Sequence, residues 1–192
     1  YGLSESIGPG SVHLGIGNTH KVGAIGKAGY RWQTRIVDEN GHPVEQGEVG
    51  ELCLKGPGVM REYYKDPQAT AAVLRDGWLY TGDMAQEDED GFIFLVDRKK
   101  DVIITGGENI YPREIEELIY THEAVQDVQV IGVPSKKFGE EVMACIILKE
   151  GARVTVDEMH DFIAKNISRH KVPSYIKFVD SFPMTASGKI QK

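Results

Sequence analysis

The chain has 192 residues, of which 41% are hydrophobic and 27% are charged, and its formal net charge is -7. These values are ordinary for a globular protein, and the acidic balance argues against a nucleic-acid binder, whose binding surface would be basic. The sequence has no apolar run near the roughly 20 residues that a membrane-spanning helix needs. It shows no signal peptide either, so we expect a cytoplasmic protein without a transmembrane segment.

Two cysteines, Cys53 and Cys145, lie far apart, each in an apolar, strand-like run. No Cys or His cluster has the spacing of a zinc site, so we expect both to be buried, reduced thiols. The chain begins at Tyr1 rather than Met and ends at Lys192, and we interpret it as a fragment.

The first half of the chain is predicted to be loop followed by short strands. Residues 1–20 are rich in Gly, Ser and His and are expected to be loop. Strands are then predicted at 35–38, before an Asn-Gly turn typical of hairpins, at 51–55, where polar–apolar alternation indicates a half-buried strand, at 77–81 and at 92–96. Asp66 is expected to cap a short helix that begins at Pro67. Residues from about 23 to 96 therefore predict a β-rich, barrel-like unit.

The second half alternates helices and strands after the charged run that begins at Asp97. Pro112 is expected to open one helix, and Thr155 with Glu158 forms a capping box for another. The apolar residues expected to face the core from these helices are Ile115, Leu118, Ile119, Met159, Phe162, Ile163 and Ile167. With strands predicted at 125–133, 142–148 and 175–179, residues 97–192 indicate a small α+β domain, and the whole chain a mixed α/β fold.

Four segments carry the chemistry that the sequence suggests. In chain order they are Tyr1-Gly2-Leu3-Ser4-Glu5; Tyr80-Thr81-Gly82-Asp83; Asp97-Arg98-Lys99-Lys100-Asp101 running into Gly106-Gly107-Glu108-Asn109-Ile110-Tyr111-Pro112; and Pro183-Met184-Thr185-Ala186-Ser187-Gly188-Lys189-Ile190. Each segment alone is weak evidence for a function. Together and in this order they resemble the superfamily of acyl-CoA synthetases, peptide-synthetase adenylation domains and luciferases. The resemblance covers essentially the whole chain, and the third segment looks most like fatty-acid or aryl-acid CoA ligases.

The resemblance implies that the first segment belongs to an ATP/AMP site. Tyr1 would stack on adenine, which suits its flat apolar face and polar tip. Gly2 and Ser4 would belong to the same site, where the Ser4 hydroxyl can bond a phosphate oxygen. Glu5 would hold the magnesium ion bound to the ATP phosphates, because a hard cation needs oxygen ligands.

Two further segments are implied to complete the nucleotide site. Asp83 would accept hydrogen bonds from the ribose hydroxyls, with Arg98 as the second ribose contact, whereas Lys99 is expected to be solvated. Lys189 is implied to be the catalytic residue, reaching the acid carboxylate and the α-phosphate. A fixed cation there offsets the repulsion between two anionic groups, and Gly188 gives the loop freedom to place it.

The third segment is implied to serve the second half of a two-step reaction. Asp97 stands where the family hinges, so residues 97–192 would be a mobile C-terminal domain and residues 1–96 the end of the large AMP-binding domain. Gly106, Gly107 and Glu108 match a loop that binds the pantetheine arm of CoA, although turn formation alone also explains two glycines. Lys136, Lys137 and Lys171 could meet the CoA phosphates or simply form a solvated face.

These features predict an AMP-forming acid–thiol ligase. It would activate a carboxylic acid, expected to be a fatty acid, with ATP and Mg²⁺ and then pass the acyl group to CoA. Alternatives are an aryl-acid CoA ligase, an adenylation domain that loads a carrier protein, and a non-catalytic interaction module. The family's phosphate loop and most of its acyl pocket would precede Tyr1, so the chain alone is expected to be inactive; a homodimer is left open.

Overall fold

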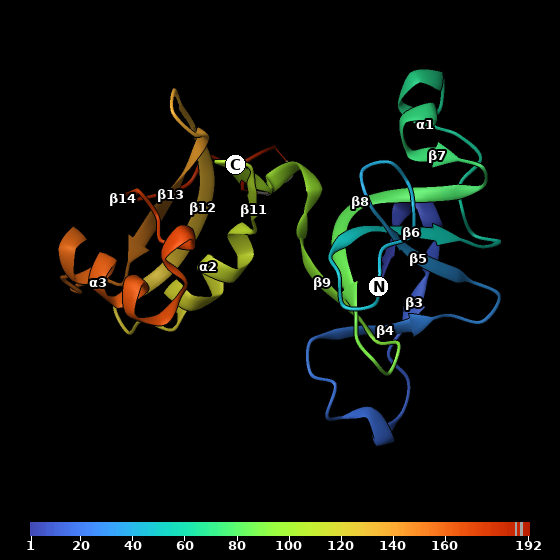
Figure 1. Ribbon diagram of the computed structural model, residues 1–192, viewed down its shortest axis with the longest axis horizontal. Helices are drawn as coiled ribbons and strands as arrows, with labels where there is room; N and C mark the ends of the chain where they lie inside the picture. The colour runs from blue at the N-terminus through green and yellow to red at the C-terminus, as the bar shows by residue number, and fades with distance from the viewer. Residues whose placement is uncertain (187, 189) are drawn as a thin grey trace. The chain divides into compact units, whose positions relative to one another are not determined.

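The computed structural model describes residues 1–186, 188 and 190–192. The chain folds into two compact units, Tyr1–Lys99 and Lys100–Lys192, each of which is described by itself below. Both appear in Figure 1, the first in blue to green and the second in green-yellow to red. A β-rich first unit and an α+β second unit confirm the predicted mixed α/β fold class.

The first unit is built on a seven-stranded antiparallel sheet. Its strand order is β3 (Ser11–Val12), β4 (Ala24–Ala28), β9 (Ile93–Arg98), β8 (Trp78–Glu87), β6 (Gly50–Lys55) and β5 (Gln33–Val37), and β7 (Leu74–Arg75) pairs with β8. The sheet is curled, in a half-barrel rather than a closed barrel (Figure 1). Helix α1 (Pro67–Val73) begins as predicted, with the Asp66 carboxylate accepting from the Ala69 amide at 2.9 Å.

Two predictions for the first unit are wrong. Residues 1–20 are not simply loop, because they contain β1 (Gly2–Leu3), β2 (Gly8–Pro9), β3 and the 3₁₀ turns η1 (Ser4–Ser6) and η2 (Ile16–Asn18). The alternating segment is not half-buried: β6 lies between β5 and β8, and Gly50–Leu54 is buried throughout, including the polar Glu51. The polar–apolar alternation predicted one exposed face, but this central strand buries both of its faces.

The predicted Asn-Gly turn is present, but its return strand is short. Gly41 has a φ of 83° and donates its amide to the Asp38 carbonyl at 3.1 Å. Beyond the turn only a single bridge, between Val37 and Pro43, continues the pairing. Val37 also pairs with Glu51 of β6 on its other side. Proline has no amide hydrogen with which to extend a ladder outward, so this short segment covers the edge of β5 without adding a full strand.

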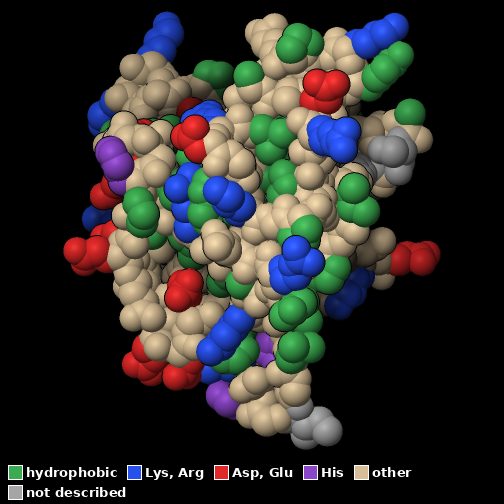
Figure 2. Space-filling view, turned by 90° about the vertical axis from the view of Figure 1, so that its right-hand side faces the viewer, with side chains coloured by type: hydrophobic (Ala, Val, Ile, Leu, Met, Phe, Trp, Pro, Cys, Tyr) green, Lys and Arg blue, Asp and Glu red, His purple; other side chains and the backbone are tan. Residues whose placement is uncertain are grey.

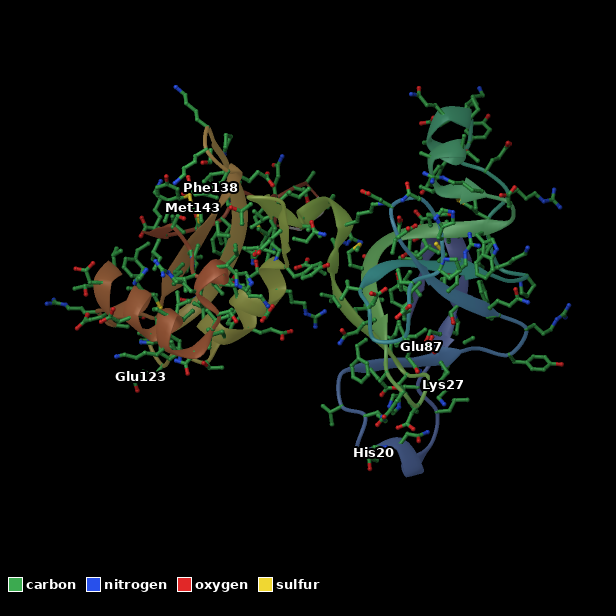
Figure 3. All side chains as sticks on the ribbon, in the orientation of Figure 1. His20, Lys27, Glu87, Glu123, Phe138 and Met143 are labelled. Atoms are coloured by element: carbon green, nitrogen blue, oxygen red, sulfur yellow. The ribbon has the colours of Figure 1, made fainter. Side chains whose placement is uncertain are left out.

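The second unit has a five-stranded sheet covered by two helices. Its order is β11 (Glu108–Ile110), β10 (Ile103–Thr105), β13 (Gly139–Leu148) and β12 (Val125–Ser135), with β14 (Tyr175–Phe178) parallel to β13. The helices are α2 (Pro112–Tyr120) and α3 (Val156–Asn166), and η3 (Lys99–Asp101) and η4 (Arg169–Lys171) are 3₁₀ turns. Figure 3 labels Phe138 at the β12–β13 turn and Glu123 at the opposite end of this hairpin.

The predicted helix faces and cap of the second unit are confirmed. Ile115, Ile119, Met159 and Ile163 are fully buried against the sheet, and Leu118, Phe162 and Ile167 pack beside them half-buried. The Thr155 hydroxyl accepts from the Glu158 amide at 3.2 Å, while the Glu158 carboxylate accepts from the Thr155 amide at 2.8 Å. This reciprocal pair satisfies donors that an uncapped helix start would leave open.

Both cysteines are free thiols, as predicted. Cys53 is fully buried, whereas Cys145 is only half-buried. Burial and the nearby Glu51 carboxylate raise the pKa of the Cys53 thiol to about 11, which makes it a poor nucleophile at neutral pH.

The surface is mixed in charge. On the face shown in Figure 2, Lys and Arg side chains lie among acidic and apolar ones. None of the helices in the described part of the chain has the length and apolar character to cross a membrane.

Candidate nucleotide site

Three residues from distant parts of the first unit meet at one carboxylate. The Tyr1 hydroxyl donates to Asp83 Oδ2, although the two residues are 82 positions apart. Arg98 Nε lies 3.3 Å from Asp83 Oδ1. The Asp83 side chain is 10% exposed and that of Arg98 57% exposed, so a buried acceptor lies beside a cation that reaches solvent. The structure thus brings Tyr1, Asp83 and Arg98 together.

Asp83 lies at an irregularity in the sheet. Between β6 and β8, Glu51 pairs with Met84 and Cys53 pairs with Tyr80, so Thr81, Gly82 and Asp83 together oppose a single residue, Leu52. Such a bulge bends the strand and re-aims its side chains. Gly82 has a φ of 73°, which favours glycine, and its presence in the motif is explained by this geometry.

A second irregularity lies on the neighbouring strand. Asp83 pairs with Arg98 and Met84 with Asp97, but Ala85 pairs with Leu95, so β9 carries one extra residue just before Asp97. Bulges on both strands place Asp83 and Arg98 directly opposite each other, where their side chains can meet.

The bulge in β8 is held by side chains on either side of it. The Thr81 hydroxyl donates to the Leu52 carbonyl at 2.7 Å and accepts from the Asp83 amide at 3.2 Å. The Gly82 amide donates to Glu51 Oε1 at 3.0 Å, and Lys99 Nζ lies 2.7 Å from Glu51 Oε2. Lys99 is therefore not simply solvated as predicted. The charged run around Lys99 gives no indication of this partner, because Glu51 lies 48 positions away in the sequence.

Burial and the Asp83 carboxylate govern the titration of the tyrosine in this cluster. Desolvation raises the pKa of Tyr1, and its hydrogen bond to Asp83 raises it further. The phenol therefore stays protonated at neutral pH and acts as a donor to the carboxylate.

The predicted magnesium residue has a partner that the sequence did not reveal. Tyr63 donates its hydroxyl to Glu5 Oε1 at 2.9 Å, and the Met60 amide donates to the Glu5 carbonyl at 2.7 Å. A carboxylate offers about four lone-pair sites, so Glu5 retains capacity to coordinate a cation through Oε2. Tyr63 lies in the Glu62-Tyr63-Tyr64 run, where nothing in the sequence distinguishes it from the exposed Tyr64.

Gly2 and Ser4 both precede Glu5 in the first segment. Ser4 is exposed at the start of η1, where its hydroxyl is accessible to a ligand. A Cβ on Gly2 would lie 2.3 Å from the Gly8 carbonyl oxygen. The pairing of β1 with β2 thus requires glycine at this position, whatever else the residue does.

The predicted CoA loop is a tight turn. Gly106 and Gly107, with φ of 59° and 89°, join β10 to β11, a conformation that favours glycine. The Gly106 amide donates to the Phe138 carbonyl at 2.9 Å, which ties this turn to the exposed loop containing Lys136 and Lys137. Glu108 is exposed at the start of β11. Turn formation therefore accounts for both glycines, and their role toward CoA stays a prediction.

Three further predicted residues stand as follows. Lys189 lies outside the described residues, although Met184 and Ile190 on either side of it form a bridge. Lys171 Nζ is paired with Glu114 at 2.6 Å. Asp97 lies within β9, and the two units divide after Lys99. The hinge at Asp97 therefore stays a prediction.

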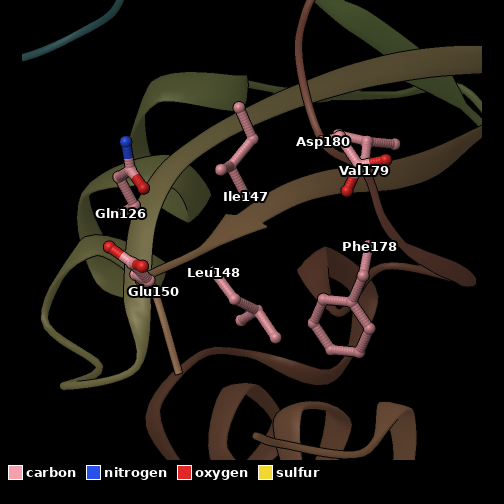
Figure 4. Close-up of a pocket in the computed structure, with 7 residues that line it drawn as sticks. All are labelled: Gln126, Ile147, Leu148, Glu150, Phe178, Val179 and Asp180. Carbon is pink, nitrogen blue, oxygen red and sulfur yellow. The ribbon is translucent and has the colours of Figure 1, made fainter. Parts of the chain in front are cut away.

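The described surface also has open hollows away from these residues. One of about 390 Å³ lies in the second unit, where Figure 4 shows Ile147, Leu148 and Phe178 between the carboxylates of Glu150 and Asp180. None of the site residues predicted from the sequence lines it. Within the described residues, no group of three or more His, Cys, Asp or Glu side chains could hold a metal ion alone, so a magnesium ion at Glu5 would need ligands from elsewhere, such as phosphates.

Two family descriptions match the chain in succession: "AMP-binding enzyme" over residues 1–64 and "AMP-binding enzyme C-terminal domain" over residues 114–189. The chain is similar to the long-chain-fatty-acid–CoA ligase of Bacillus subtilis (strain 168), with 46% identity over 191 residues, 99% of this chain and 34% of the relative. It is similar to the feruloyl-CoA synthase of Amycolatopsis sp, with 42% identity over 193 residues, 100% of this chain and 39% of the relative.

A solved structure supports the same relationship. The o-succinylbenzoate CoA synthetase of Bacillus subtilis, in complex with its acyl-adenylate intermediate, matches with a TM-score of 0.91 and 34% identity over 99% of this chain and 39% of that chain. The chain thus spans between 34% and 39% of the length of these three relatives. The predicted resemblance is confirmed, and the chain belongs to the AMP-binding enzyme superfamily that includes the acyl-CoA synthetases.

Proposed function

We propose that this chain is the C-terminal part of an AMP-forming acid–thiol ligase. The enzyme would convert a carboxylic acid and ATP to an acyl-adenylate and pyrophosphate, and then transfer the acyl group to CoA with release of AMP. The observation that carries the proposal is the convergence of Tyr1, Asp83 and Arg98 on one bulge. The family resemblance assigns all three residues to the same nucleotide, and their side chains meet although they lie far apart in sequence.

The cluster suits the sugar and base of a nucleotide. The Asp83 carboxylate can accept hydrogen bonds from two neighbouring hydroxyl groups, since each of its oxygens has two lone pairs. Arg98 would compensate the carboxylate charge and donate to the ribose. The half-buried Tyr1 ring, which packs against the core of the first unit, offers an apolar face for a base.

Glu5 fits a magnesium ion that ATP brings with it. Tyr63 occupies Oε1 of Glu5, and the remaining oxygen would bind the ion together with the phosphates. When bound, Mg²⁺ would offset the negative phosphate charge that otherwise repels the attacking carboxylate. The o-succinylbenzoate enzyme has been solved with ATP and a magnesium ion, which supports this assignment.

Lys189 would supply the catalytic cation during adenylation. It would bring the acid carboxylate and the α-phosphate together by offsetting their repulsion. The second unit would then reorient about a hinge near Asp97, so that the Gly106-Gly107 turn lines the path of the CoA thiol. Two half-reactions with different catalytic groups favour such a rearrangement over one rigid site.

A fatty acid is the substrate class that we propose. The long-chain ligase of Bacillus subtilis, at 46% identity, supports this choice. An aryl acid is the second candidate, favoured by the feruloyl-CoA synthase at 42% identity over the full chain. Thioester formation by an enzyme that carries this chain, measured with fatty and hydroxycinnamic acids in parallel, distinguishes the two.

The adenylation role is tested in a full-length chimaera. This chain replaces the matching segment of the Bacillus subtilis long-chain ligase, and pyrophosphate exchange is measured with a fatty acid. Lys189→Ala is expected to lower the exchange rate by about 10²–10³-fold, the usual cost of removing one group that stabilises developing charge. Lys165→Ala, an exposed lysine on α3, should leave the rate unchanged. A Lys189→Ala rate equal to that of the control would refute the catalytic role.

The thiol acceptor is tested with the same chimaera. A carrier-protein-loading domain would transfer the acyl group to a phosphopantetheinylated carrier in preference to CoA, whereas the proposed ligase forms acyl-CoA. The 192-residue chain by itself is expected to form neither product, and measurable acyl-CoA from it would contradict that expectation.

A further inference from the structure

Glu51 is a buried carboxylate whose two oxygens hold different parts of the first unit. Its side chain is 8% exposed. Oε1 accepts from the Gly82 amide at 3.0 Å, directly before Asp83, and Oε2 lies 2.7 Å from Lys99 Nζ. Glu51 thus connects the bulge that carries the proposed ribose ligand with the last residue of the first unit.

We propose that Glu51 is a positioning residue for Asp83, and that its ion pair with Lys99 makes this positioning depend on the segment where the first unit ends. Glu51 does not contact the nucleotide in this proposal and acts through the backbone of Gly82. The role of Asp83 as a ribose ligand rests on the proposed function. The contacts of Glu51 with Gly82 and Lys99 do not depend on it.

The two members of the ion pair differ in their access to water. The Lys99 side chain is 51% exposed and can be solvated when it leaves, but the Glu51 side chain is 8% exposed and cannot be solvated in its present position. Removing the cation would leave a buried carboxylate whose remaining partner is the neutral Gly82 amide, and an uncompensated buried charge is unfavourable. The carboxylate would then turn toward water and release the Gly82 amide.

The position of Lys99 gives this release a functional consequence. Lys99 ends the first unit and begins η3, and the second unit follows at once. A reorientation of the segment after Lys99 that draws its side chain away would loosen the Asp83 bulge, and one that keeps the pair would hold it. The pair therefore couples nucleotide affinity to the conformation of the connecting segment.

Hydrogen exchange of the Gly82 amide in the 192-residue chain tests the structural connection. Lys99→Met removes the charge and keeps the length of the side chain, and we expect it to accelerate Gly82 exchange about tenfold, since a hydrogen bond to a buried charged group is lost. Glu51→Gln/Lys99→Met keeps an amide oxygen for Gly82 and leaves no unpaired charge, so exchange should return to near the wild-type rate. Lys65→Met removes one exposed cation of the same unit and is the matched control.

The functional arm uses the same four proteins within the full-length chimaera. Lys99→Met should raise the KM for ATP several-fold in pyrophosphate exchange with little change in kcat, and the double variant should restore this KM. In the double variant the ratio of adenylation to thioester rates should differ from wild type, because the coupling is absent. A general loss of folding would instead lower kcat in both half-reactions and would not be rescued.

The outcomes separate this inference from the proposed function. If the unaltered chimaera forms no adenylate, the proposed function fails and the exchange arm still decides whether Glu51 and Lys99 hold Gly82. If the chimaera is active but Lys99→Met matches Lys65→Met in both arms, the inference is overturned. Accelerated exchange that the double variant does not rescue also overturns it, since removal of the unpaired charge would then be irrelevant.

Discussion

The two units place their candidate residues in different ways. In the first unit, polar groups lie inside the sheet: Glu51 and Asp83, counted as whole residues, are both 7% exposed, and a bulge interrupts the ladder beside them. In the second unit the buried cluster is apolar, and the Gly106-Gly107 turn lies at an exposed edge. The first arrangement suits a site that must hold one geometry, whereas the second suits groups that a ligand or a moving segment must reach.

The comparison predicts that the two units lose stability separately, because each has its own core. Ile163→Ala removes a fully buried side chain from the second unit and should destabilise that unit by about 2–5 kcal/mol. Both tryptophans, Trp32 and Trp78, lie in the first unit. Urea unfolding followed by tryptophan fluorescence should therefore be unchanged, while the far-ultraviolet circular dichroism transition shifts to lower urea.

Leu52→Ala provides the matched variant in the first unit. Leu52 is also fully buried, so it should shift the fluorescence transition by a similar amount. If Ile163→Ala shifts both signals together, the units unfold as one cooperative body and the comparison fails.

The sequence predicted the second unit better than the first, because local patterns determine more of the second unit. Helix faces and a capping box are local patterns, so Ile115, Thr155 and Glu158 could be interpreted from their spacing. Local patterns do not report which distant strand a residue meets. Glu51 therefore read as the polar face of a half-buried strand and Lys99 as a solvated charge, although they pair with each other.

The same distinction between local patterns and tertiary contacts applies to the residues of the candidate site. Asp83 and Arg98 were predicted by motif, and the register of β8 with β9 explains why they meet. Tyr63 and Glu51 were missed because their roles arise only from tertiary contacts. No signal in a single sequence separates Tyr63 from Tyr64, whereas glycine at position 82 was a hint of irregular backbone within a strand.

The bulge itself is tested by Gly82→Ala. A Cβ at this position meets no other heavy atom within 4 Å, so only the φ of 73° opposes alanine. The expected loss is about 1–2 kcal/mol, measured as a shift in the fluorescence-detected urea transition. Gly107→Ala in the second unit has the same open surroundings and a φ of 89°, and it should leave the fluorescence transition unchanged. A cost for Gly107→Ala alone would show that the bulge at Gly82 is not strained.

The partner of Glu5 is tested by Tyr63→Phe, which removes only the hydroxyl group. Because a net hydrogen bond contributes about 1 kcal/mol, the magnesium concentration for half-maximal pyrophosphate exchange in the chimaera should rise about fivefold. Tyr64→Phe is the matched control, since Tyr64 is 85% exposed. Equal magnesium dependence in the two variants would mean that Tyr63 does not orient Glu5.

The smallest expected effect is a change in the pKa of one carboxylate that leaves a second one unchanged. The pKa values of the two are lowered by different partners. In the first unit, the hydrogen bond from Lys21 is the main cause that lowers the pKa of Asp88; in the second unit, the amide of Thr155 lowers the pKa of Glu158. A lowered folded pKa stabilises the native state at neutral pH, and this contribution is lost as the pH falls through that pKa.

Lys21→Met should raise the Asp88 midpoint in an NMR titration toward its ordinary value of about 3.9 without moving the midpoint of Glu158. Lys27→Met, which removes a donor to the Asp90 carbonyl instead, should leave Asp88 nearly unchanged. A shift of both carboxylates in Lys21→Met would show that net charge, rather than the local pair, sets these values, and that the two units do not differ in this respect.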